Sequence, residues 1–133
     1  MKLDDYATKK YKKPKYSDKE IQESCYEYGK TFGYLDMFET IDMIEKSNDL
    51  KMLQSELKKQ NKLVDFFIVM KDYEDYVQIP NVSKSWETNM TYFQKELNYK
   101  FDDKELGICK KSFYESYPYG VRDYITEKFK KIK

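Results

Sequence analysis

Apolar residues recur every three or four positions through most of this 133-residue chain, and this spacing constrains the fold more than any other feature. The first series follows Ser17-Asp18-Lys19-Glu20, which has the form of a helix capping box. Because positions three and four apart share one side of an α-helix, the series predicts an amphipathic helix. Gly29 and Gly33 interrupt it, so we expect a kink or a close helix contact there. The apolar positions are Ile21, Cys25, Tyr28, Phe32 and Leu35, with Phe38, Ile41 and Ile44 continuing on a slightly rotated face.

Similar series follow each turn signal. Ser47-Asn48-Asp49 marks a turn, Pro80 ends a second region and Ser83 caps a third. A fourth region begins at Asp102 or Asp103, and Pro118 and Gly120 punctuate it. The sequence therefore predicts a mainly α fold, an irregular bundle of four to six helices forming one domain over residues 17–133. Residues 64–70 are also β-branched and aromatic enough for a buried strand, so a hairpin at about 63–79 in an α+β fold is the alternative to a helix that reaches about residue 77.

Residues 1–16 differ from the rest in composition. They carry six lysines and two aspartates, hold few aliphatic residues and include Pro14. We expect a flexible basic arm rather than a helix. Lysines neutralise phosphates and tyrosines stack on unpaired bases, so the arm is either a nucleic-acid contact or a solubilising tail. Its candidate contacts are Lys9, Lys10, Tyr11, Lys12, Lys13, Lys15 and Tyr16.

Several kinds of catalytic site lack their residues. Histidine is absent, Arg122 is the single arginine, and there are only four glycines. Triads based on histidine, histidine metal sites and clamps built from several arginines are therefore excluded. Four glycines leave little material for phosphate-cradling loops, and no established catalytic motif is present. An enzyme built on carboxylates alone is the least favoured alternative. We expect a protein that is not an enzyme and that carries no cofactor and no metal.

Cys25 and Cys109 could form at most one bridge, and no CxxC pair exists. The N-terminal residues lack the apolar region of a secretory signal, and the longest apolar run, residues 66–70, is far too short to span a membrane. We therefore expect two buried free thiols, no membrane association and a cytoplasmic location.

Charge is segregated along the chain. Residues 17–77 carry eight lysines and fourteen acidic residues, whereas residues 78–133 carry eleven basic and eight acidic residues. The acidic middle can pair with the basic ends within one molecule, pair between subunits, or bind an external partner. Its acidic stripe is either a solvated helix face or a protein-binding face that competes with nucleic acid for a basic groove. The candidate protein-binding residues are Asp36, Glu39, Asp42, Glu45 and Asp49.

Residues 106–117, Leu-Gly-Ile-Cys-Lys-Lys-Ser-Phe-Tyr-Glu-Ser-Tyr, resemble the turn and recognition helix of helix-turn-helix proteins, particularly TetR-type repressors. The resemblance implies a tight turn at Gly107 and a second helix anchored in the core by Phe113. It also implies that Lys110, Lys111, Ser112 and Tyr114 face the major groove and its phosphates.

The favoured function is non-catalytic binding of a macromolecule, with a host or cognate protein as the partner. Fourteen tyrosines are many for a small core, and exposed tyrosines are common at binding sites. Residues with A/T-rich codons dominate the composition, which suits a small phage or mobile-element accessory protein that modulates or inhibits a host complex. The alternative is a DNA-binding transcriptional regulator that uses residues 106–117, with a homodimer possible.

Overall fold

The structure, a computed structural model, describes residues 15–133, and every regular element within that range is helical. The mainly α prediction is therefore confirmed, and the alternative hairpin at about 63–79 is wrong because residues 63–72 are a helix. The elements are α2 (Asp18–Lys46), the 3₁₀ turn η1 (Asn48–Leu50), α3 (Lys51–Lys59), α4 (Leu63–Asp72), α5 (Val82–Leu97) and α6 (Asp103–Lys128).

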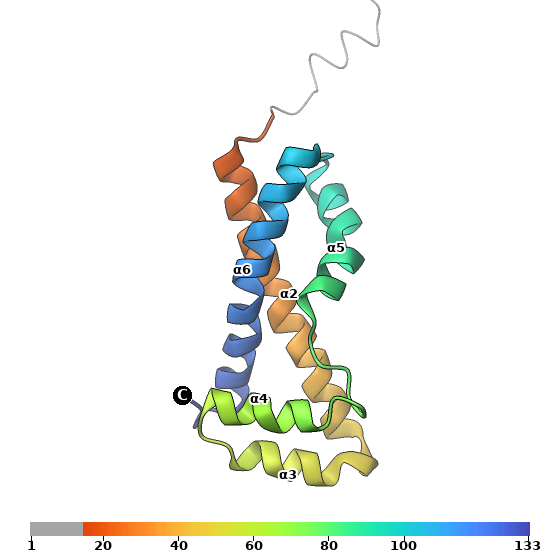
Figure 1. The fold of residues 1–133 in the computed structure, drawn as a ribbon, viewed down its shortest axis with the longest axis vertical. Helices are drawn as coiled ribbons and strands as arrows, with labels where there is room; N and C mark the ends of the chain where they lie inside the picture. The colour runs from red at the N-terminus through yellow and green to blue at the C-terminus, as the bar shows by residue number, and fades with distance from the viewer. Residues whose placement is uncertain (1–14) are drawn as a thin grey trace, which may run out of the picture.

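Two long helices, α2 and α6, run side by side along the length of the molecule (Figure 1). They are parallel: Cys25 meets Cys109 near the start of both helices, and Glu45 meets Lys128 near the end of both. Helix α5 lies against their upper half, and α3 and α4 cross their lower end (Figure 1). The longest helix of the chain thus has the C-terminal helix as its main neighbour.

Glycines set the distance between α2 and α6. An ideal Cβ built on Gly33 would overlap the backbone carbonyl oxygen of Tyr117, and one on Gly120 would overlap that of Lys30. Gly29 faces the backbone of Phe113 in the same way. The close helix contact predicted at Gly29 and Gly33 is confirmed, and its physical cause is the approach of two backbones at positions without side chains.

Aromatic rings fill the space between α2, α5 and α6. Phe93 and Phe113 are completely buried, and their ring centroids lie 5.5 Å apart. Phe32 reaches Phe93 from α2 at 5.2 Å, and Trp86 reaches Phe113 from α5 at 5.5 Å. At the lower end Phe66 of α4 packs on Phe129, with a centroid distance of 5.1 Å. One continuous core therefore joins both ends of the bundle.

Cys25 and Cys109 form a disulfide that joins α2 to α6, and both residues are fully buried. The prediction of two buried free thiols is therefore wrong. The helical spacing had already placed both cysteines on core-facing sides of their helices. The parallel pairing of α2 and α6 brings them together across 84 residues of sequence, which local spacing does not reveal.

Capping residues mark where several helices begin. Ser17 accepts a hydrogen bond from the Glu20 amide and forms the predicted capping box, and Asp102 does the same with Glu105. Helix α5 is capped by Asn81 instead of the predicted Ser83. The helix predicted to reach about residue 77 is interrupted: α3 ends at Lys59, and α4 ends at Asp72.

The turn implied at Gly107 is wrong, because α6 is one continuous helix from Asp103 to Lys128. Pro118 also lies inside this helix instead of ending it. A helix-turn-helix needs two helices at an angle, joined at the glycine. The resemblance of residues 106–117 to TetR-type repressors therefore does not extend to their structure.

Candidate functional site

One side of α2 carries large apolar side chains that the rest of the molecule leaves exposed. Leu35, Phe38 and Met43 are 43, 46 and 59% exposed. At 100° per residue these three lie on one helix face together with Glu39 and Asp42. We call these five residues the α2 face. The opposite side of the same turns is buried by Met37, Ile41 and Ile44.

The aromatic member of the α2 face is held by its neighbours. The ring of Phe38 lies edge-on to that of Tyr124 on α6, with centroids 5.8 Å apart. Tyr34 contacts the same ring at 5.3 Å, and its hydroxyl donates to Glu127 at 2.5 Å. This hydrogen bond raises the pKa of Tyr34 above its ordinary value. The α2 face is thus supported from behind by α6.

The predicted acidic stripe divides into separate environments. Asp36 accepts a hydrogen bond of 2.6 Å from the Tyr117 hydroxyl, and Asp42 pairs with Lys46 at 2.8 Å. Glu45 pairs with Lys128 at 3.1 Å and Asp18 with Lys104 at 3.2 Å, so acidic residues of the middle region do meet the basic C-terminal region within the molecule. Glu39 and Asp49 are exposed, with no salt bridge or side-chain hydrogen bond to residues 15–133.

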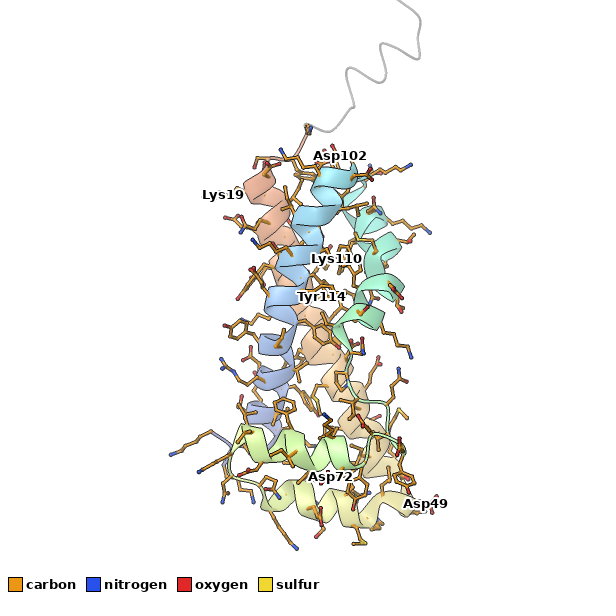
Figure 2. All side chains as sticks on the ribbon, in the orientation of Figure 1. Lys19, Asp49, Asp72, Asp102, Lys110 and Tyr114 are labelled. Atoms are coloured by element: carbon orange, nitrogen blue, oxygen red, sulfur yellow. A yellow bond between two sulfur atoms is a disulfide. The ribbon has the colours of Figure 1, made fainter. Side chains whose placement is uncertain are left out.

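These five carboxylates do not form one surface. A spacing of three residues turns by 60° around a helix, so Asp36 and Glu45 lie on opposite sides of α2. Asp49 lies beyond the helix in η1, at the lower end of the molecule (Figure 2). Only Glu39 and Asp42 belong to the α2 face.

A polar groove of about 210 Å³ borders the α2 face and separates α2 from the start of α5. Glu39 and Met43 line it from α2, and Asn81 and Lys84 line it from α5. The Thr40 hydroxyl lies 3.0 Å from the Gln78 carbonyl oxygen and ties α2 to the segment before α5. The charged residues of the lining are Asp36, Glu39 and Lys84, and Asp36 already accepts the Tyr117 hydroxyl.

Burial and charge act together on the tyrosine beneath the α2 face. Desolvation, followed by the hydrogen bond to Asp36 and the charge of that carboxylate, raises the pKa of Tyr117 far above its usual range. The phenol thus stays neutral at ordinary pH and donates its proton to Asp36. This bond fixes α2 against α6 at the level of the α2 face.

The residues predicted to contact nucleic acid are also divided. Lys110 and Lys111 are exposed on α6 and Tyr114 is half-buried. Lys110 Nζ lies 5.6 Å from the centre of the Tyr114 ring, and Figure 2 labels both residues. Ser112 is only 3% exposed, so its predicted groove contact is wrong. It lies three residues after Cys109 and four before Ser116, both fully buried, so it faces the interior.

Of the basic arm, the structure describes only residues 15 and 16. Tyr16 packs edge-on against Tyr99, with ring centroids 4.9 Å apart, and Lys15 is exposed. Lys9, Lys10, Tyr11, Lys12 and Lys13 lie outside the described residues.

Apolar spacing alone does not reveal the α2 face, because it places Leu35 and Phe38 on the buried side. Cys25, Gly29 and Gly33 line the α2–α6 contact at intervals of four, and the buried Met37 continues the same interval. Two of these are glycines, which a search for apolar residues passes over. A search for small residues at the same interval would have found this side and left Leu35 and Phe38 on the exposed one.

Within residues 15–133 no group of three or more acidic or cysteine side chains is placed to hold a metal ion. No helix in that range is both long enough and apolar enough to cross a membrane. No protein-family model matches the chain, and it has no significant match among curated proteins or solved structures.

Proposed function

We propose that this protein binds another protein through the α2 face and carries out no catalysis. The observation that carries the proposal is the exposure of Leu35, Phe38 and Met43 on one helix face beside Glu39. Protein–protein contacts combine exposed apolar area with charged groups, and on this face Glu39 and Asp42 lie among the apolar side chains.

The chemistry of the α2 face indicates what its partner offers. An apolar patch would pack on Leu35 and Met43, and a lysine or arginine would pair with Glu39, whose carboxylate has no partner within the described residues. Phe38 contributes a ring already positioned by Tyr124, which lowers the entropy lost on binding. A basic, apolar protein surface is therefore the partner that fits best.

The compartment we propose differs from the one expected from the sequence. Disulfides form and persist in oxidising environments and are rare in reducing cytosols. The buried Cys25–Cys109 bond therefore favours action in an oxidising compartment over a cytoplasmic one. The role we propose there remains that of an accessory protein that modulates a host protein complex, supported by its size and composition.

Affinity capture from the native host, with and without nuclease, tests this proposal. Wild-type protein should retain one stoichiometric protein partner after nuclease treatment. Glu39→Lys combined with Met43→Ser should reduce capture at least about tenfold, because it reverses the free charge and removes an exposed apolar contact.

Glu87→Lys is the matched control for the charge reversal. Glu87 is exposed on α5 and makes no salt bridge or side-chain hydrogen bond to the described residues. Its reversal should leave capture unchanged. Loss of the partner on nuclease treatment would contradict the proposal. So would a loss of capture in Glu87→Lys as large as that in the Glu39→Lys, Met43→Ser variant.

A further inference from the structure

A second groove, different in character, lies among α2, α4, α6 and the segment that leads into α5. Its volume is about 580 Å³. Met37 and Met70 form its floor and are 1 and 2% exposed, whereas Phe67 and Tyr119 stand at its rim and are 39 and 46% exposed. We call it the apolar groove. It falls within the size range of small-molecule sites, which are largely apolar with few polar groups.

The polar groups available in the apolar groove are few. Eleven residues line it, and Arg122 is the one charged residue among them. The hydroxyl of Tyr117 is already bonded to Asp36, which leaves the Tyr119 hydroxyl as the other polar tip. Within residues 15–133 no carboxylate lines the groove and no salt bridge engages Arg122.

Arg122 stands at the edge of the groove beside Tyr119. Its guanidinium carbon lies 5.1 Å from the centre of the Tyr119 ring, a cation–π distance that restrains the side chain. The guanidinium therefore offers its donors at a defined place, next to apolar walls and without a competing acidic group.

This pattern of groups selects among occupants. An extended peptide would bring a backbone N–H and C=O at every residue, and the lining offers almost nothing to pair them. An unbranched alkyl chain needs no hydrogen bonds, and a carboxylate at its end would be met by Arg122. The methionine floor is flexible enough to follow such a chain.

We propose that the apolar groove binds an aliphatic monocarboxylate, with the alkyl chain over Met37 and Met70 and the carboxylate at Arg122. This site uses none of the residues of the α2 face and does not depend on the function proposed for that face.

Decanoate is a suitable probe, at concentrations below those at which it forms micelles. In protein labelled with ¹³C at the methionine methyls, decanoate should shift the signals of Met37 and Met70 in a saturable way. Met52 is 71% exposed on α3 and is outside the groove lining, so its signal should not move. Decyltrimethylammonium, with the same chain and the opposite charge, should bind at least about tenfold more weakly.

Arg122→Gln should weaken decanoate binding about tenfold, equivalent to roughly 1.4 kcal/mol, and leave binding of decan-1-ol unchanged. Lys71→Gln removes the same charge from an exposed site on α4 outside the groove lining and should have no effect. The proposal is overturned if decanoate leaves Met37 and Met70 unmoved, if Met52 shifts in parallel, or if the cationic probe binds equally well. It is also overturned if the captured protein partner shifts the methyl signals of Met37 and Met70 and decanoate does not.

Discussion

Single positions without side chains hold the two main helices together. Gly29, Gly33 and Gly120 each lie where a Cβ would overlap atoms of the facing helix. Gly107 shows the opposite case, since a Cβ there would have no neighbour within 4 Å. The same residue type is thus a packing requirement at three positions and a plain cost to helix stability at the fourth.

A pair of alanine substitutions tests this difference. Gly33→Ala should lower the free energy of unfolding by about 3 kcal/mol, because its methyl group meets backbone that cannot move aside alone. Gly107→Ala should raise it by roughly 0.5–1 kcal/mol, because alanine favours the helix and nothing obstructs it. Urea denaturation with the disulfide intact measures both. A neutral or stabilising Gly33→Ala would show that α2 and α6 are further apart than described.

The second residue-scale prediction concerns alkaline pH. Burial, together with a hydrogen bond donated to Asp36, raises the pKa of Tyr117. Burial and a hydrogen bond donated to Glu96 raise the pKa of Tyr28 in the same way. Unfolded tyrosines ionise near pH 10, so the native state holds these protons more tightly than the unfolded state does. The stabilisation is complete below about pH 10 and is lost as pH rises toward the native pKa.

The free energy of unfolding should therefore fall above about pH 10, and the fall should be shallower in Tyr117→Phe than in the wild type. Tyr119→Phe removes a hydroxyl from an exposed tyrosine of the same helix and is the control. Denaturant titrations at a series of pH values measure the slopes. Equal slopes in all three proteins would mean that the Tyr117–Asp36 bond does not contribute.

Among whole elements, α6 shows most clearly which features local sequence signals predict and which they do not. The start at Asp102–Asp103 could be predicted, because a capping residue acts on the amides next to it in the chain. The continuation through Gly107 and Pro118 could not. Phe113, Tyr117 and Val121 pack along the length of the helix, and this tertiary contact outweighs two local helix breakers. Pro118 has no N–H to donate to the carbonyl of Tyr114, four residues earlier. Because Pro118 is exposed, water can hydrate that carbonyl instead.

The capping box at the start of α6 gives this helix an acid dependence. The hydrogen bond that Asp102 accepts from the Glu105 amide is the main cause of a lowered Asp102 pKa. An Asp pKa depressed in the native state adds stability above the unfolded value of about 3.9, and this stability is lost as pH falls through the native pKa.

Asp102→Asn should keep the cap and remove its pH dependence, because asparagine is also a good capping residue. The melting temperature of the variant should then fall less between about pH 5 and pH 2 than that of the wild type. Asp103→Asn removes the same charge from a carboxylate that accepts no hydrogen bond from the described residues, and it should follow the wild type. An Asp102→Asn variant as acid-sensitive as the wild type would contradict this interpretation of the cap.

For the whole molecule, the features that the sequence did not disclose are those that join distant segments. The helical periods and two of the caps could be read locally. The Cys25–Cys109 bond, the parallel pairing of α2 and α6 and both grooves depend on residues tens of positions apart. The candidate site was partly predicted: Glu39 and Asp42 were named, but Leu35 was placed in the core because the glycine side of α2 was not recognised.

Reduction of the disulfide is a test at this scale. The bond closes a loop of 84 residues between α2 and α6, so it lowers the conformational entropy of the unfolded chain. Its loss, by a reductant or by Cys25→Ala with Cys109→Ala, should lower the free energy of unfolding by about 4 kcal/mol. Urea denaturation of the oxidised, reduced and doubly substituted proteins measures this difference. Unchanged stability on reduction would indicate that the two thiols are not paired in solution.

The most direct test of the proposed function is site-specific photo-crosslinking in the native host. A photoreactive amino acid is placed at Met43 on the α2 face or at Met52 on α3, two exposed methionines on different surfaces. Position 43 should yield one discrete protein adduct that survives nuclease, and position 52 should yield none. No adduct at position 43, or the same adducts from both positions, would show that the α2 face is not where this protein meets its partner.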